Sequence, residues 1–141
     1  QKRLEMVFVD ADGELLPGDP PFFRAMQGHR EGIENHASMR DSHIDPPILI
    51  HFVDQFGSLV KGMWNVTALL TVEDSREGTA LLGNEESSTG GRVEFPRLAI
   101  LGRLGQNITL NFVSLISKNV AVTASAVVYA EPCPPGTSEF A

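Results

Sequence analysis

The chain is poor in cysteine, in aromatic residues and in long apolar runs. One cysteine among 141 residues cannot close an internal disulfide. No apolar stretch approaches the roughly 20 residues that a membrane-spanning helix needs, so no membrane span is predicted. Lys and Arg do not cluster, and 18 acidic against 11 basic residues give a net charge of −7. Because such a chain would repel a phosphate backbone, we expect no nucleic-acid partner.

The first residues, Gln1 to Arg3, contain neither an initiator methionine nor the apolar segment of a signal peptide. We therefore expect the chain to be a processed or excised piece of a longer protein. Its length and its 42% of hydrophobic residues suit one folded domain with a sizeable core.

Short segments in which apolar and polar residues alternate are abundant, and this pattern is typical of strands with one buried face. They predict an all-β fold, an antiparallel immunoglobulin-like β-sandwich of about seven strands. A parallel α/β fold is disfavoured, because no helical pattern alternates with the strands after residue 45. The expected strands cover residues 4–8, 48–53, 64–72, 80–82, 93–100 with a kink at Pro96, 107–112 and 120–128.

We expect the sandwich to occupy residues 1–130, with one long loop insertion over about 10–45, and a linker to occupy residues 131–141. Residues 22–39 lack strand alternation, and Gly28 and Gly32 each disfavour a helix by about 1 kcal/mol relative to Ala. An ordered loop with at most a short helix is therefore expected there. A loop of this length is usually functional or mobile, which makes 18–45 a candidate contact surface.

The predicted linker contains Cys133 among prolines, which cannot donate to a strand ladder. A free thiol, a disulfide to a partner outside this chain, and the first cysteine of a following module all stay open. We prefer the last, because Cys-Pro-Pro-Gly-Thr resembles the opening of small cysteine-rich modules in extracellular proteins.

Residues 48–128 present an ordered series of short elements. These are Ile48 to Val60, a strand from Val66 to Leu70, Gly83, Gly90 and Gly91, Val93 and Phe95, Leu98 and Ile100, Gly105, Ile108 to Leu110 and the last strand. The series resembles the bacterial immunoglobulin-like repeats of the invasin and intimin type, found in multidomain cell-surface proteins, although Ser58 stands where Asn is usual. The resemblance implies a stiff spacer or adhesive repeat without catalysis or a cofactor. Its implied partners are neighbouring domains of the same polypeptide or other copies of it.

A tight turn is predicted after the strand that ends near residue 53. Gly57 can take the positive φ that such a turn requires, and Asp54 can accept a backbone N–H bond across it. Phe56 would then plug the end of the sandwich. We interpret Asp54, Phe56 and Gly57 as a structural turn rather than as a binding site.

Two N-glycosylation sequons occur, Asn65-Val66-Thr67 and Asn107-Ile108-Thr109. Each asparagine lies on the face opposite the apolar residues of its strand, so both side chains are predicted to point outward. If the protein is secreted by a eukaryote, we expect at least one of the two to carry a glycan.

An apolar strand ending in Asp10-Ala11-Asp12-Gly13 resembles the nucleophile motif of haloacid-dehalogenase-type phosphatases, where one carboxylate attacks phosphorus and the other is the acid/base. That chemistry also needs a doubly wound parallel sheet, which the antiparallel pattern here does not predict. Asp10, Asp12 and Glu14 could alternatively ligate Ca²⁺, but Gly13 falls at position four, where an EF-hand loop has its Gly at position six.

His29, His36 and His43 recur at a regular spacing and could together hold Zn²⁺ or Cu²⁺. Successive histidines would be about 10 Å apart on a straight helix, so only a folded-back loop could bring them to one ion. Surface histidines are the plainer interpretation.

The sequence therefore predicts a non-catalytic structural or adhesion domain, extracellular or at the cell surface, within a larger surface or filament glycoprotein. One alternative is a ligand- or metal-binding module that uses the 18–45 loop. A lesser alternative is a phosphatase-like enzyme that uses Asp10 and Asp12.

Overall fold

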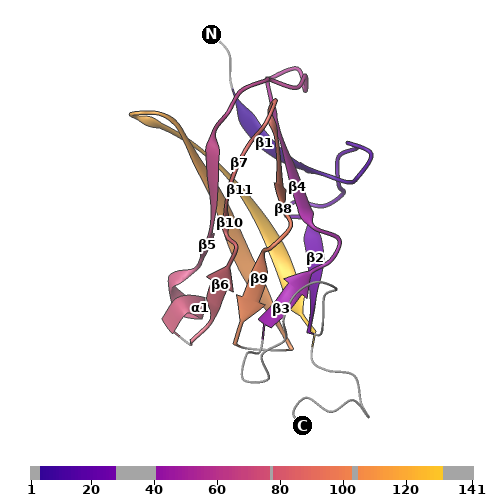
Figure 1. The fold of residues 1–141 in the computed structure, drawn as a ribbon, viewed down its shortest axis with the longest axis vertical. Helices are drawn as coiled ribbons and strands as arrows, with labels where there is room; N and C mark the ends of the chain where they lie inside the picture. The colour runs from indigo at the N-terminus through magenta and orange to yellow at the C-terminus, as the bar shows by residue number, and fades with distance from the viewer. Residues whose placement is uncertain (1–3, 28–40, 77, 103–104, 132–141) are drawn as a thin grey trace.

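The computed structural model describes residues 4–27, 41–76, 78–102 and 105–131. In these ranges the chain is all-β, as predicted: strands β1 to β11 form two sheets, and the five-residue α1 (Val72–Arg76) is the one helix described. Figure 1 shows the two sheets packed face to face along the long axis of the molecule. No helix in the described ranges is long and apolar enough to cross a membrane.

The smaller sheet has three antiparallel strands in the order β1-β4-β8. They are β1 (Glu5–Val9), β4 (Ile48–Val53) and β8 (Arg92–Phe95). Alternate residues of each strand are buried, such as Ile48, Ile50 and Phe52 of β4. This is the period-two pattern expected of a sheet with one face on the core.

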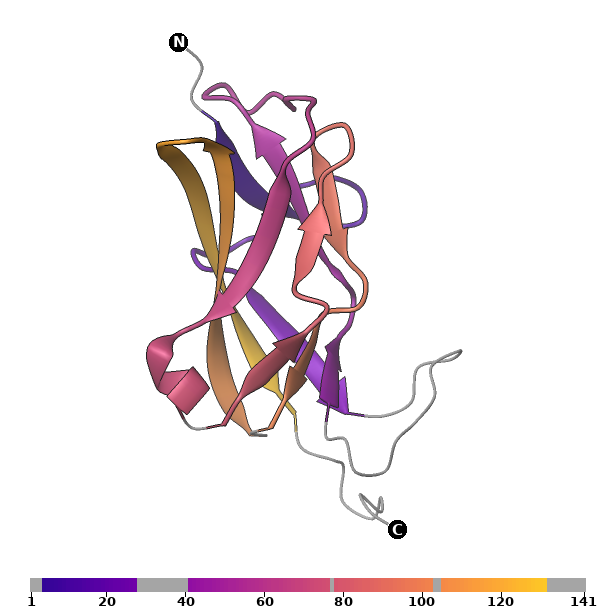
Figure 2. The same ribbon diagram turned by 60° about the vertical axis from the view of Figure 1, so that its left-hand side comes forward.

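The larger sheet has eight strands in the order β6-β9-β3-β2-β11-β10-β5-β7, and it curls around the core (Figure 2). Its strands are β2 (Phe22–Gln27), β3 (Asp41–Ile44), β5 (Asn65–Leu70), β6 (Ala80–Leu82), β7 (Glu85–Ser87), β9 (Ala99–Leu101), β10 (Gln106–Ser117) and β11 (Val120–Ala130). All neighbours are antiparallel except β2 and β11, which pair in parallel from Phe22↔Val127 to Ala25↔Ala130. A sheet of this size differs from the simple seven-strand arrangement that was expected.

Three pairs of consecutive strands pass from one sheet to the other or change partner at a bend. β3 continues into β4 past Pro46 and Pro47, and β8 continues into β9 past Pro96. β3 pairs with β9 in the larger sheet, and β4 pairs with β8 in the smaller one. In the third pair, β6 next to β9 continues past Gly83 into β7 next to β5. The kink predicted at Pro96 is therefore a corner where the ladder is interrupted.

Phe112 lies at the centre of the core and joins the two sheets. Its ring, fully buried on β10, makes edge contacts with Phe8 of β1 at 5.4 Å and with Phe95 of β8 at 5.2 Å between ring centroids. Phe52 packs against Trp64 at 4.7 Å. Aromatic pairs at these distances add to the stabilisation that burial itself provides.

The prediction of one long loop over residues 10–45 is wrong at two segments, because β2 and β3 lie within this range. In β2, exposed Phe22 and Met26 alternate with buried Phe23 and Ala25, so apolar residues on both faces hid the strand pattern. In β3 the buried position before Ile44 is a serine, Ser42, and this concealed the pattern again. Residues 28–40 of this segment, with His29 and His36, lie outside the described residues.

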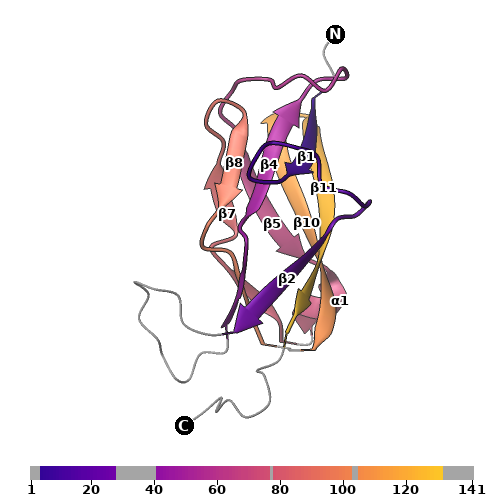
Figure 3. The same ribbon diagram turned by 90° about the vertical axis from the view of Figure 1, so that its right-hand side faces the viewer.

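The strand β1 starts at one end of the long axis, and β11 ends at the opposite end (Figures 1 and 3). The chain therefore enters and leaves the described domain at opposite poles. The predicted linker lies outside the described residues from position 132 onward.

Candidate functional site

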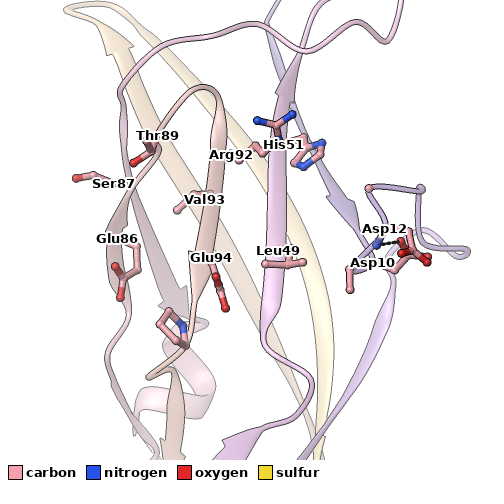
Figure 4. A pocket seen from close by; sticks show the side chains of 13 residues that line it. Asp10, Asp12, Leu49, His51, Glu86, Ser87, Thr89, Arg92, Val93 and Glu94 are labelled. Carbon is pink, nitrogen blue, oxygen red and sulfur yellow. Dashed lines mark hydrogen bonds between the residues drawn. The ribbon is translucent and has the colours of Figure 1, made fainter.

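A groove of about 750 Å³ lies over the outer face of the smaller sheet (Figure 4). The turn after β1 forms one wall, β4 and β8 form the floor, and β7 with the β7–β8 connection forms the other wall. Its ionisable side chains are Asp10, Asp12, His51, Glu86, Arg92 and Glu94.

Asp10 holds the turn after β1 together. Its Oδ1 accepts the backbone N–H of Asp12 at 2.9 Å and of Glu14 at 3.0 Å. The N–H of Asp10 donates to the carbonyl of Glu14, and the N–H of Gly13 donates to the carbonyl of Asp10, both at 2.9 Å. Gly13 takes a φ of 85°, which only glycine adopts without strain.

Asp54 holds the turn after β4 in the same way. Its Oδ1 accepts the N–H of Phe56 at 2.9 Å and of Ser58 at 3.0 Å, and Gly57 takes a φ of 81°. The two segments also match in sequence, with Phe-Val-Asp-x-x-Gly-x-Leu at residues 8–15 and again at residues 52–59. This internal repeat was not predicted from the sequence, because the two segments were considered separately, Asp10 within the disfavoured phosphatase and calcium alternatives and Asp54 as part of a structural turn.

The matched turns favour a structural role for Asp10 over a catalytic one. Its strand β1 pairs antiparallel with β4, whereas the phosphatase motif belongs to a doubly wound parallel sheet. In the part of the chain that the structure describes, no group of three His, Cys, Asp or Glu side chains that could hold a metal ion is found, at Asp10, Asp12 and Glu14 or elsewhere.

His51 and Arg92 face each other as cross-strand partners in β4 and β8. The imidazole also lies beneath the first turn, since a Cβ built on Gly13 would be 3.6 Å from its Cε1. Burial, and secondarily the charge of Arg92, lower the pKa of His51 below its ordinary 6.5. Both causes favour the neutral form of the His51 imidazole over the cation. This pair was not predicted from the sequence, because the pairing of β4 with β8 cannot be deduced from the local sequence of either strand.

The groove supplies carboxylates on both walls and one arginine on its floor (Figure 4). Its hydroxyl side chains include Ser87, whose Oγ donates to Asn65 at 2.5 Å. Within the described residues, His51 has no hydrogen bond to a serine or threonine hydroxyl, so the nucleophile and base pairing of hydrolases is not formed there. With these side chains, the groove can contact polar or cationic groups of a ligand.

Both sequon asparagines are exposed on the outer face of the larger sheet, and neither lines the groove. Asn65 begins β5 and Asn107 lies near the start of β10, and each precedes a fully buried residue, Val66 or Ile108. The outward orientation predicted for Asn65 and Asn107 is confirmed.

The prediction that Phe56 plugs an end of the sandwich is wrong. Its side chain is 81% exposed, while its backbone N–H donates to Asp54 within the turn. The indole ring of Trp64 packs on Phe52 instead. Gly62 lies so close to this indole that a Cβ on Gly62 would be 2.2 Å from it. Among the other predicted residues, His43 lies on β3, while Cys133 lies outside the described residues.

No protein-family model matches the chain, and no curated protein matches it either. By its fold and its groove, the chain is an all-β domain of two packed sheets with an open polar groove on the smaller sheet. The likeness to invasin and intimin repeats stays a prediction from the residues quoted above.

Proposed function

We propose that the chain is a non-catalytic structural or adhesion domain, an extracellular repeat or spacer in a larger cell-surface or surface-filament glycoprotein. The observation that carries this proposal is the placement of the chain's entry and exit at opposite poles of the domain (Figure 1). Domains with this geometry can follow one another end to end, so that each adds its length to an extended molecule.

The strand order supports an immunoglobulin-like sandwich as the form of this spacer. Three pairs of consecutive strands can each be counted as one strand that turns a corner. They are β3 with β4, β6 with β7, and β8 with β9. The first strand is also divided, with β1 paired to β4 and β2 paired to β11. This count gives about seven strands in two layers, as in immunoglobulin-like folds.

The role of Asp10 supports a non-catalytic function. Its carboxylate accepts hydrogen bonds from two backbone amides of the turn. Asp54 makes the same two bonds in a turn that contains no second acidic residue. A phosphatase-like activity would need that carboxylate as a nucleophile. Phosphate release in the presence of Mg²⁺, abolished by Asp10→Asn but not by Asp54→Asn, would contradict the proposal.

The extracellular setting is tested by the intact mass of the protein purified from its natural source, before and after deglycosylation and thiol alkylation. We expect a mass above 15.3 kDa that falls on deglycosylation. We also expect Cys133 to resist alkylation until a disulfide to another module is reduced. An unmodified chain with a freely alkylated Cys133 would contradict the setting.

A ligand-binding module is a second candidate, and the groove over the smaller sheet favours it. Binding to the native state alone would raise the melting temperature with ligand concentration. Thermal unfolding with divalent metals, amino sugars and short basic peptides tests this candidate, and Arg92→Gln is the matched change in the groove floor.

A further inference from the structure

A second groove, of about 710 Å³, lies on the outer face of the larger sheet and adjoins the first, since Ser87 of the first groove donates a hydrogen bond to Asn65 of the second. It runs over β5 and β10, which are paired through Thr67↔Val113 and Leu69↔Asn111. Its lining includes Met63, Asn65, Thr67, Leu69, Val113 and Leu115.

The apolar side chains of this groove are unusually open to solvent. Met63 is 77% exposed, Leu115 is 69% exposed and Leu69 is 47% exposed. Single exposed apolar residues are ordinary, but several gathered in one groove mark a surface that is normally covered. The question is therefore what covers this one.

Asn65 lies within the same groove, two residues after Met63 and on the same face of β5 as Thr67, the third residue of its sequon. The Ser87 hydroxyl donates to Asn65 Oδ1 at 2.5 Å. This bond uses the carbonyl side of the amide and leaves Nδ2, the atom that receives a sugar, to point away from Ser87. The side-chain amide of Asn65 is thus held by Ser87, at a residue that lines the apolar groove.

We propose that Asn65 carries an N-linked glycan whose first sugars lie in this groove and cover Met63, Leu69 and Leu115. The proposal rests on the extracellular setting proposed above. Pyranose rings suit the groove, because their C–H faces can lie on apolar side chains while their hydroxyl groups stay in water. In the transfer, Nδ2 forms a bond to the anomeric carbon of an oligosaccharide, the bond from that carbon to its lipid pyrophosphate donor breaks, and one amide proton is released.

The second sequon provides an internal comparison. Asn107 is exposed on the same sheet, but its register partner is Tyr129 on β11 and it is not part of the groove lining. A glycan on Asn107 would therefore add mass and solubility without covering Met63, Leu69 or Leu115. The two sites should respond differently when each is removed.

The test is secretion of the full chain from eukaryotic cells as wild type, Thr67→Val and Thr109→Val. Each valine has nearly the shape of threonine and destroys one sequon, while Thr67→Ser keeps the sequon at Asn65 and serves as its control. Glycopeptide mass spectrometry reports the occupancy of each site. Binding of an apolar-surface dye and sedimentation velocity report the exposure of the groove.

We expect Asn65 to be occupied and Thr67→Val to raise dye binding several-fold and to promote self-association, with Thr67→Ser and Thr109→Val behaving as wild type. A further substitution, Leu115→Ser in the Thr67→Val background, should return dye binding toward the wild-type level. This second variant separates groove exposure from a general loss of folding, which Leu115→Ser would not reverse.

The outcomes also separate this inference from the setting on which it rests. Glycan on Asn107 but not on Asn65 would leave the secreted domain intact and overturn the inference, as would unchanged dye binding in Thr67→Val when Asn65 is occupied in wild type. Self-association of a secreted wild-type chain that carries no glycan on Asn65 would assign the groove to a second copy and would also overturn it. Absence of glycan from both sites in a secreted chain would contradict the glycoprotein setting itself.

Discussion

Asp10 and Asp54 occupy the same position in two copies of one turn, and each carboxylate accepts two backbone N–H groups through Oδ1. The strands that lead into these turns, β1 and β4, are antiparallel neighbours, with Glu5 opposite Val53 and Val9 opposite Leu49. The two turns therefore close opposite ends of the same strand pair. After each turn the chain returns, and Leu16 and Val60 donate to the carbonyls of Phe8 and Phe52.

The first prediction concerns this equivalence. Asp10→Ala and Asp54→Ala should each lower the free energy of unfolding by about 1–2 kcal/mol, because each leaves two turn amides without their carboxylate acceptor. Asn in either position should lose less, since its carbonyl oxygen can still accept. Urea denaturation measures both values, and a loss at Asp54 with none at Asp10 would contradict the equivalence of the turns.

The second prediction compares two glycines with similar backbone conformations. Gly57 has a φ of 81° and Gly91 a φ of 84°, so Ala at either position should be disfavoured by about 1–2 kcal/mol. Gly57→Ala should show only this effect, as no atom lies within 4 Å of the added Cβ. At Gly91 the Cβ would lie 2.2 Å from the carbonyl oxygen of Val60, so Gly91→Ala should be the more destabilising change. Equal midpoints in urea would contradict the predicted difference.

The third prediction is a pH dependence that arises from His51. Its pKa is lowered in the folded state, so the unfolded chain binds the proton more readily and stability falls as the pH drops below about 6.5. His51→Gln should make the unfolding free energy less dependent on pH between 7 and 5. Arg92→Gln should remove a smaller part of this pH dependence, because burial lowers the pKa of His51 more than the charge of Arg92 does. Parallel profiles for wild type and His51→Gln would show that this histidine contributes nothing.

The fourth prediction contrasts two buried neighbours on β10. Phe112→Ala should lower the free energy of unfolding by about 3–5 kcal/mol, since it empties the contact between the sheets. Ser114 is also buried, and its hydroxyl has no hydrogen-bond partner among the described residues. Ser114→Ala should therefore be neutral or stabilising by up to about 1 kcal/mol. A clear loss of stability in Ser114→Ala would mean that the hydroxyl is satisfied in solution.

Much of the fold could be predicted from alternation, because strands such as β4 and β5 bury one face and expose the other. β2 could not, since Phe22 and Met26 are apolar but exposed, and local sequence does not say which of two apolar faces meets the core. Nor could the passage of β3 into β4 be predicted. Its two strands belong to different sheets because of pairing with β9 and β8, which lie far along the chain.

The candidate sites were predictable only where a short motif was enough. The sequons and the turn at Asp54 are local, so the exposure of Asn65 and Asn107 and the conformation of Gly57 followed from neighbouring residues. The groove that combines His51 with Arg92 depends on strand register, which is a long-range property. The apolar groove beside Asn65 depends in the same way on the pairing of β5 with β10.

The parallel pairing of β2 with β11 has a mechanical consequence. The two strands run side by side toward the same pole, and β2 follows the first strand of the chain while β11 is the last (Figure 3). A pull on the two ends along the long axis would slide β2 against β11 instead of peeling them apart. The ladder hydrogen bonds between them lie across that direction, so several must break at once. The domain would therefore resist stretching more strongly than an arrangement in which the same bonds open one after another.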